Sequence, residues 1–222
     1  MKNGIHTLRS VVLVALAACA LSAGIARADV IVTVDPVAIT NGYMNVFDLS
    51  NNYQWGSGWA PVDLTATWSG NDVTLGPNSI GDPNPYWYTP SGGPGAVGNK
   101  IMEANLYAEQ TGPLAGQTVT FKGCVLANSL TPAHVATAFI RDFAPDFSSF
   151  NTTIIPLPTS GHFTLSLATV NDPARHVQYG FQVRGACVWV TDRGPFGSAT
   201  IGTESATPAQ PKSWGRLKSL YR

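Results

Sequence analysis

Short segments rich in β-branched and aromatic residues alternate along most of the chain with turns rich in Gly, Pro, Asn and Asp. This pattern limits the possible folds more than any other property, because it is typical of β-sandwiches and barrels. Helical periodicity is nearly absent before residue 203. We therefore expect an all-β domain, a two-sheet antiparallel jelly-roll β-sandwich. The expected strands are 30–35, 42–49, 62–69, 72–76, 100–109, 117–127, 134–142, 150–156, 161–169, 176–184, 187–191 and 197–202.

The first 28 residues are organised like an export signal. Lys2 and Arg9 provide positive charge, residues 11–21 are apolar, and Ala26-Arg27-Ala28 has the small-x-small pattern of a signal-peptidase site. The apolar run is shorter than the roughly 20 residues that cross a bilayer. We expect a cleaved signal peptide (1–28), a mature chain beginning at Asp29, and a secreted, periplasmic or cell-surface location.

Two alternatives concern the ends of the chain. Leu16-Ala17-Ala18-Cys19 fits a lipobox, which would make Cys19 a lipidated N-terminus. Residues 29–202 are the expected sandwich domain. Residues 203–222 are expected to be a linker followed by a flexible basic tail, in which Trp214, Leu217 and Leu220 recur at helical spacing. This tail is either a small docking helix or frayed, because isolated short helices are marginal in water.

The charge of the expected domain excludes one class of partner. Between Asp29 and Glu204 there are 13 acidic and six basic residues, which gives a net charge of −7. Nucleic-acid binding depends on the opposite sign, so no nucleic-acid partner is expected. This negative charge is compatible with neutral polyols or calcium as ligands. Oxygen ligands such as Asp29, Asp35, Asp172 and Asp192 are present but lack EF-hand spacing, so a structural calcium stays an open alternative without assigned ligands, and no other cofactor is expected.

The mature chain contains two cysteines, Cys124 and Cys187. In an exported protein, this number predicts a disulfide between them. The alternative is two separately buried thiols.

Motifs for catalysis are missing from the sequence. It contains no HExxH, GxSxG, Walker or dinucleotide-binding pattern. Glu103 and Glu109 lie on one expected strand about 20 Å apart by strand rise, whereas a glycosidase pair is separated by about 5–10 Å. No enzymatic activity is expected. The alternative is a polysaccharide hydrolase or lyase that uses Asp142 and Asp146.

Alternation within two expected strands gives a candidate binding face. In 101–109 the even positions are apolar, while Glu103, Asn105 and Tyr107 point to the other side. In 176–184 the apolar positions likewise alternate with polar ones, among them Gln178, Gln182 and Arg184. Planar polar side chains pair with sugar hydroxyls, and aromatic rings stack on the apolar face of a pyranose. A merely solvated sheet face is the alternative.

Aromatic residues in loops extend this candidate site. Trp59 lies in a Gly/Ser-rich segment, and Trp87 and Tyr88 lie in a proline-rich segment, 76–99. Loops of this length inside a compact domain are often functional. We include Trp59, Trp87 and Tyr88 as candidate ligand-binding residues. Structural plugs at the end of the sandwich are the alternative.

The C-terminal third resembles the last strands of jelly-roll carbohydrate-binding modules with the galactose-binding-like fold. The resemblance is carried by Val177-Gln178-Tyr179-Gly180-Phe181-Gln182, by Val188-Trp189-Val190-Thr191-Asp192, and by the preceding Gly161-His162-Phe163-Thr164-Leu165-Ser166-Leu167. It implies a non-catalytic polysaccharide-binding domain, often with one structural calcium, in which Gln178 and Gln182 face the ligand. In its pattern of strands it covers about residues 29–202.

Taken together, these features predict a secreted, non-catalytic carbohydrate-binding protein whose partner is a polysaccharide or other glycan. A structural or adhesive matrix or cell-surface protein without a sugar ligand is the main alternative. The sequence leaves the oligomeric state open.

Overall fold

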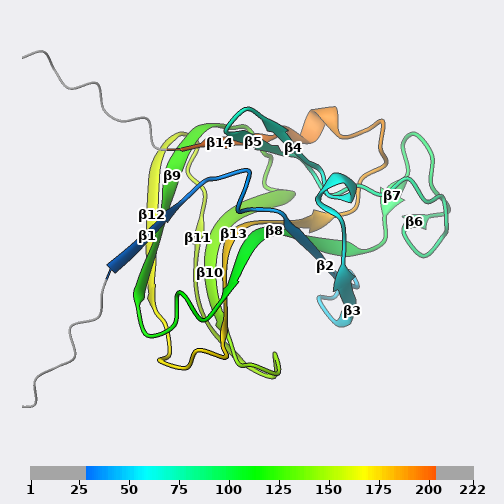
Figure 1. Cartoon of the computed structure of the whole chain (residues 1–222). Coiled ribbons are helices and arrows are strands. Elements are labelled where there is room, and N and C mark those ends of the chain that lie inside the picture. Colours follow the sequence, from blue (N-terminus) through cyan, green and yellow to red (C-terminus); the bar gives the residue numbers. More distant parts are fainter. Residues whose placement is uncertain (1–28, 204–222) are drawn as a thin grey trace, which may run out of the picture.

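The computed structural model describes residues 29–203 of the 222-residue chain, and these form a β-sandwich of two large sheets (Figure 1). The first sheet contains β1 (Asp29–Thr33), β9 (Thr118–Asn128), β14 (Ala199–Gly202), β5 (Asp72–Leu75) and β4 (Ala66–Ser69), paired in that order, and β12 (Gly161–Ala168), which also pairs with β9. The second contains β11 (Phe150–Pro156), β10 (His134–Phe143), β13 (His176–Ala186), β8 (Ile101–Thr111), β2 (Asn41–Phe47) and β3 (Tyr53–Gly58), in that order.

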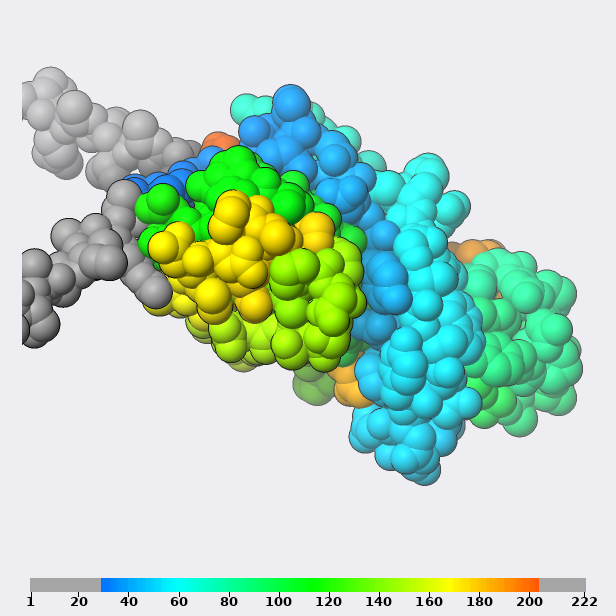
Figure 2. Space-filling model, turned by 60° about the horizontal axis from the view of Figure 1, so that its bottom comes forward, coloured from blue at the N-terminus to red at the C-terminus, as the bar shows by residue number. Residues whose placement is uncertain are grey.

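Neighbouring strands in both sheets are antiparallel, except that β1 lies parallel to β9. The short strands β6 (Tyr88–Thr89) and β7 (Val97–Gly98) pair with each other, and two 3₁₀ turns, η1 (Pro61–Asp63) and η2 (Gly194–Phe196), complete the described elements. The segment with β6 and β7 projects at one end of the molecule (Figures 1 and 2). The predicted all-β sandwich is confirmed.

The core lies between the two sheets and follows the predicted alternation. On β8 the buried apolar positions are the even ones, and on β13 they are Val177, Tyr179, Phe181 and Val183. Phe121 of β9 packs against Tyr179 and Phe181 of the opposite sheet, with ring centroids 5.4 Å away in both pairs. Burying such a side chain stabilises the fold by about 1.5–3 kcal/mol.

Three strand predictions differ from the structure. The strand expected at 62–69 is shorter, because Pro61–Asp63 form the turn η1 and only Ala66–Ser69 form the strand β4. Residues 53–58 form the edge strand β3, which the sequence pattern missed because Gly56, Ser57 and Gly58 give no alternation of apolar residues. Residues 187–191 were expected to form a strand, but only Val188 makes a strand-type pair, an isolated bridge to Ser79. This segment instead packs Trp189 against the proline-rich segment, with its ring edge-on to Tyr88 at 5.4 Å.

The predicted disulfide is wrong, because Cys124 and Cys187 are both free thiols. Cys124 lies on β9 of the first sheet, whereas Cys187 follows β13 of the second. The buried Cys187 Sγ instead lies 2.9 Å from the carbonyl oxygen of Trp87, to which the thiol donates.

The predicted signal peptide, the lipobox at Cys19 and the tail from residue 204 onward lie outside the described residues. Within residues 29–203, no helix has the length and apolar character needed to cross a bilayer.

Candidate functional site

The outer face of the second sheet, opposite the core, carries a groove of about 630 Å³. Its lining residues come from β2, β3, β8, β10, β11 and β13 and from the turn between β10 and β11. They are Tyr43, Asn45, Tyr53, Glu103, Asn105, Tyr107, Glu109, Arg141, Phe143, Phe147, Phe150 and Gln178.

Four of the predicted ligand-binding residues meet in this groove: Glu103, Asn105, Tyr107 and Gln178. Strand register explains the convergence, because β8 and β13 are neighbours and Gln178 pairs with Glu109 while Gln182 pairs with Asn105. Side chains two residues apart on each strand therefore share this face. We call it the polar groove.

Asn105 organises the centre of the polar groove. It is only 2% exposed, and its Oδ1 accepts hydrogen bonds from Gln182 Nε2 and Arg141 Nη1, both at 3.0 Å. Its Nδ2 donates to the carbonyl oxygens of Tyr43 and Glu103. Because both ends of its amide are occupied, Asn105 holds its neighbours in position. Gln182 was predicted to bind ligand, but it does not line the groove and instead donates to Asn105.

The two carboxylates of the groove are each held by neighbours. Asn45 Nδ2 donates to Glu103 Oε1 at 3.0 Å, and Arg184 Nε lies 3.4 Å from Glu103 Oε2. Arg184 also donates to Asn51 Oδ1 and lies over the Phe47 ring. It was predicted to bind ligand, but it is not among the residues lining the groove, and it holds Glu103 from the side.

Glu109 occupies the other end of β8. It accepts a 2.7 Å hydrogen bond from Gln178 Nε2, and His176 Nδ1 lies 3.6 Å from its second oxygen. Thr111 Oγ1 is 2.7 Å from the same His176 nitrogen. The carboxylates are thus fixed in orientation while part of their surface faces the groove.

Tyrosines supply neutral hydroxyl groups to the groove. Burial raises the pKa of Tyr43, with a smaller contribution from Tyr53, and burial followed by Glu109 raises the pKa of Tyr107. Both phenols therefore stay protonated at neutral pH. Gly56 makes room for the group, since a Cβ there would lie 2.9 Å from both the Tyr43 ring and the Tyr53 hydroxyl.

An aromatic cluster closes one end of the groove, and the sequence analysis did not identify it. The Phe143 ring lies 5.5 Å from Phe147 and 4.9 Å from Phe150, and Phe147 stacks on His176. Phe147 and Phe150 are each 51% exposed. The available signal was three phenylalanines within eight residues around an Asp/Ser turn, which brings them together at a hairpin end.

Trp87 and Tyr88 do not reach the polar groove and are structural. Tyr88 is fully buried, and its hydroxyl lies 2.7 Å from the Ile80 carbonyl oxygen and 3.0 Å from that of Val188. Burial raises its pKa to about 12. Trp87 is buried edge-on against Trp55 at 5.9 Å. Their placement matches the alternative of plugs at the end of the sandwich.

Trp59 is also outside the polar groove. It packs partly against the core and lines a separate hollow of about 510 Å³ together with Asp63, Ser79 and Arg193. Its indole Nε1 donates to Ser57 Oγ at 3.2 Å.

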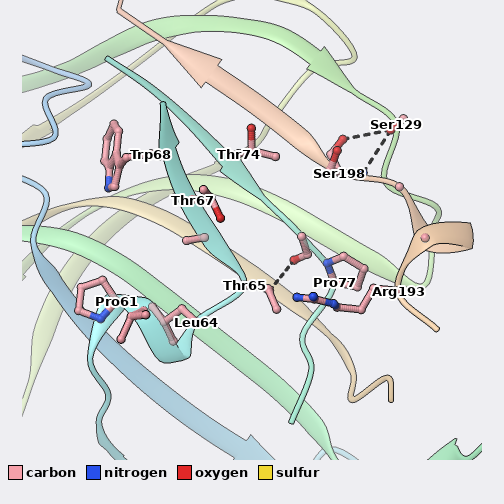
Figure 3. A pocket seen from close by; sticks show the side chains of 15 residues that line it. Pro61, Leu64, Thr65, Thr67, Trp68, Thr74, Pro77, Ser129, Arg193 and Ser198 are labelled. Carbon is pink, nitrogen blue, oxygen red and sulfur yellow. Dashed lines mark hydrogen bonds between the residues drawn. The ribbon is translucent and has the colours of Figure 1, made fainter. Parts of the chain in front are cut away.

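A third hollow, of about 960 Å³, lies over β4 and β5 of the first sheet (Figure 3). Several of its hydroxyl groups are paired within the protein: Thr65 Oγ1 donates to the Gly76 carbonyl oxygen, and Ser129 Oγ donates to the Ser198 carbonyl oxygen and accepts from the Ser198 amide. Arg193 also lines this hollow, and its side chain points toward Thr65 and Pro77 (Figure 3). Within residues 29–203, its lining contains no carboxylate or amide side chain, so this hollow is a weaker candidate than the polar groove.

Asp142 and Asp146, the carboxylates named for a hydrolase or lyase, do not form a catalytic pair. Asp142 is completely buried, with Arg175 Nε 2.8 Å from its Oδ1 and the Val170 amide donating to its Oδ2. Asp146 caps its own turn through Ser148. Among residues 29–203, no three His, Cys, Asp or Glu side chains gather to hold a metal ion.

No protein-family model matches this chain, and no similar sequence is found among curated proteins. The function is therefore argued from the geometry of the polar groove.

Proposed function

We propose that this domain is a non-catalytic carbohydrate-binding module of an exported protein and that it binds a polysaccharide in the polar groove. One observation carries the proposal: amide, phenol, carboxylate and guanidinium groups from β2, β8, β10 and β13 meet in one groove that ends in exposed aromatic rings. Sugars need this combination, because their hydroxyls pair with planar polar groups and their apolar ring faces stack on aromatics.

The groove is suited to holding an extended chain. Glu103 and Glu109 mark two positions about 20 Å apart along β8 by strand rise, and polar groups lie between them. This separation argues against a glycosidase pair, whose carboxylates lie about 5–10 Å apart. Each stacking contact or neutral hydrogen bond contributes only about 1 kcal/mol, so affinity should rise with the number of sugars bound.

Affinity electrophoresis across neutral and acidic polysaccharides tests the proposal. We expect retention by at least one polymer and weaker retention of Gln178→Ala and Phe147→Ala, which alter the groove. Thr67→Ala is the matched control, because Thr67 is exposed on the first sheet and lines the other hollow. A folded protein that no polymer retains would refute the proposal.

A further inference from the structure

Arg141 brings a positive charge into the polar groove without a carboxylate in direct contact, although the charge of Glu103 acts on it from a greater distance. Its Nη1 donates to the neutral Asn105 Oδ1, and its guanidinium carbon lies 4.0 Å from the centroid of the Phe139 ring. Within residues 29–203, no carboxylate oxygen lies within 4.0 Å of its nitrogens, whereas Arg184 lies beside Glu103 and Arg175 beside Asp142.

The position of this guanidinium is built into the sheet. Arg141 is on β10 and Asn105 on β8, so the hydrogen bond between them crosses the intervening strand β13. On this face of β13, the residue between Gln178 and Gln182 is Gly180, which has no side chain to obstruct the crossing. Gln182 holds the same Asn105 oxygen from the other side.

The arrangement leaves Arg141 with donors to spare. A guanidinium has five N–H donors, and one of them is used by Asn105. No Arg141 nitrogen is among the buried polar atoms that lack a partner, so the other donors open onto the groove. Burial lowers the pKa of Arg141, and the negative charge of Glu103 offsets this only in part.

Starting from the proposed function, we propose that the bound glycan contains an acidic sugar and that Arg141 binds its carboxylate. The planar fork of a guanidinium matches a carboxylate in a bidentate geometry that neutral hydroxyls cannot reproduce. Glu103 and Glu109 leave the free donors of Arg141 open, because the direct partners of these two carboxylates are other residues.

The net charge of the domain restricts the kind of acidic glycan that it can bind. Residues 29–203 contain 12 acidic and six basic residues, a net charge of −6, so a uniformly charged polyanion is repelled at long range. The best ligand is a mainly neutral polysaccharide with scattered uronic acid residues.

The test uses pairs of polymers that differ only in the carboxylate. Glucuronoxylan and other acidic polysaccharides are each compared with their carboxyl-reduced form by affinity electrophoresis of the mature protein. We expect carboxyl reduction to weaken retention at least about tenfold, because hydrogen bonds between charged groups are stronger than neutral ones.

Two variants locate the effect. Arg141→Lys keeps the charge but loses the fork, and should weaken binding of the acidic polymer about tenfold with little effect on the reduced one. Arg193→Lys, an exposed arginine outside the groove, is the control. If Arg141→Lys does not fold, the wild-type polymer pairs still decide. Equal retention of acidic and reduced polymers overturns the carboxylate proposal while leaving glycan binding intact; retention by neither overturns both proposals.

Discussion

Phe147 stacks almost face to face on His176, with ring centroids 4.4 Å apart and an interplanar angle of 12°. Phe147 adopts φ = 57°, a left-handed conformation that non-glycine residues rarely take. The turn holds it there through hydrogen bonds from the Phe147 amide to the Ala144 carbonyl and from the Ala144 amide to the Ser149 carbonyl. This strained residue lies at the end of the polar groove, and strain of this kind is often found where a side chain is held in place for function.

Replacing Phe147 separates the contribution of its ring to binding from the effect of its backbone conformation on stability. Phe147→Ala and Phe147→Gly both remove the ring and should weaken glycan binding about 2- to 12-fold, as expected from the loss of about 0.5–1.5 kcal/mol of stacking. The glycine variant should be more stable than the alanine variant by about 1 kcal/mol, because glycine tolerates positive φ. Affinity electrophoresis and urea unfolding measure the two effects. Unchanged affinity in both variants would remove the ring from the site.

The part of the groove that the sequence predicted comes from strict alternation. On β8 and β13, apolar and polar residues alternate without interruption around Glu103, Asn105 and Gln178, so both the strands and the facing side chains were predictable. Which strands become neighbours depends on the pairing of residues far apart in sequence, and local patterns do not contain that information.

The residues that the sequence analysis missed or placed wrongly also have a physical explanation. On β10, Val135 and Phe139 share a face with Arg141, so its outer face does not look polar. The proline-rich segment turns Trp87 and Tyr88 inward, because their large apolar area is better buried than left on a loop. Composition alone does not tell such a plug from a binding loop.

Gly180 should be irreplaceable in the floor of the groove. A Cβ at this position would meet the Leu106 carbonyl oxygen and lie 2.7 Å from Tyr107 Cα, so Gly180→Ala must push β13 and β8 apart. We expect a loss of about 1–3 kcal/mol in unfolding free energy, together with weaker glycan binding. Gly58→Ala is the control, because a Cβ there meets nothing within 4 Å. Urea denaturation measures the unfolding free energy of both variants. Equal stability of Gly180→Ala and Gly58→Ala would contradict the close packing at Gly180.

Asp142 should be important for stability and not for chemistry. Asp142→Asn leaves the Arg175 guanidinium, of which only 12% of the side chain is exposed, without its counter-charge. The expected loss is about 3–5 kcal/mol, as for other broken buried pairs. Thermal unfolding measures it, with Asp146→Asn, in an exposed turn, as the control. A variant with wild-type stability would show that the ion pair contributes little.

The two cysteines should be free thiols that differ in their rate of alkylation. In protein that starts at Asp29, alkylation after unfolding without reductant should modify both thiols, as mass spectrometry detects. In the folded protein Cys187 should react slowly, because burial raises its pKa and little thiolate forms. An unfolded, unreduced sample that resists alkylation would show a disulfide instead.

His134 should make stability depend on pH. Its side chain is almost completely buried, its Nδ1 lacks a partner, and Nε2 lies 2.9 Å from the Ala186 carbonyl oxygen. Burial lowers its pKa in the folded protein, although the Ala186 contact opposes this. When the pH falls below about 6.5, the unfolded chain is protonated first, so stability decreases until the lower folded pKa is reached. The loss is about 1.4 kcal/mol for each unit by which the pKa is lowered.

The comparison of His134→Gln with the wild type between about pH 7 and pH 5 isolates this contribution. Glutamine does not titrate, so the variant should lose the part of the pH dependence that His134 causes, even if its stability is lower throughout. Hydrogen bonds from Asn52 and Ser148 lower the pKa values of Asp48 and Asp146, whose protonation weakens the fold only below about pH 4. The two effects therefore occupy separate pH windows. Urea unfolding at each pH measures both, and parallel pH curves for the variant and the wild type between about pH 7 and pH 5 would rule out His134 as the cause.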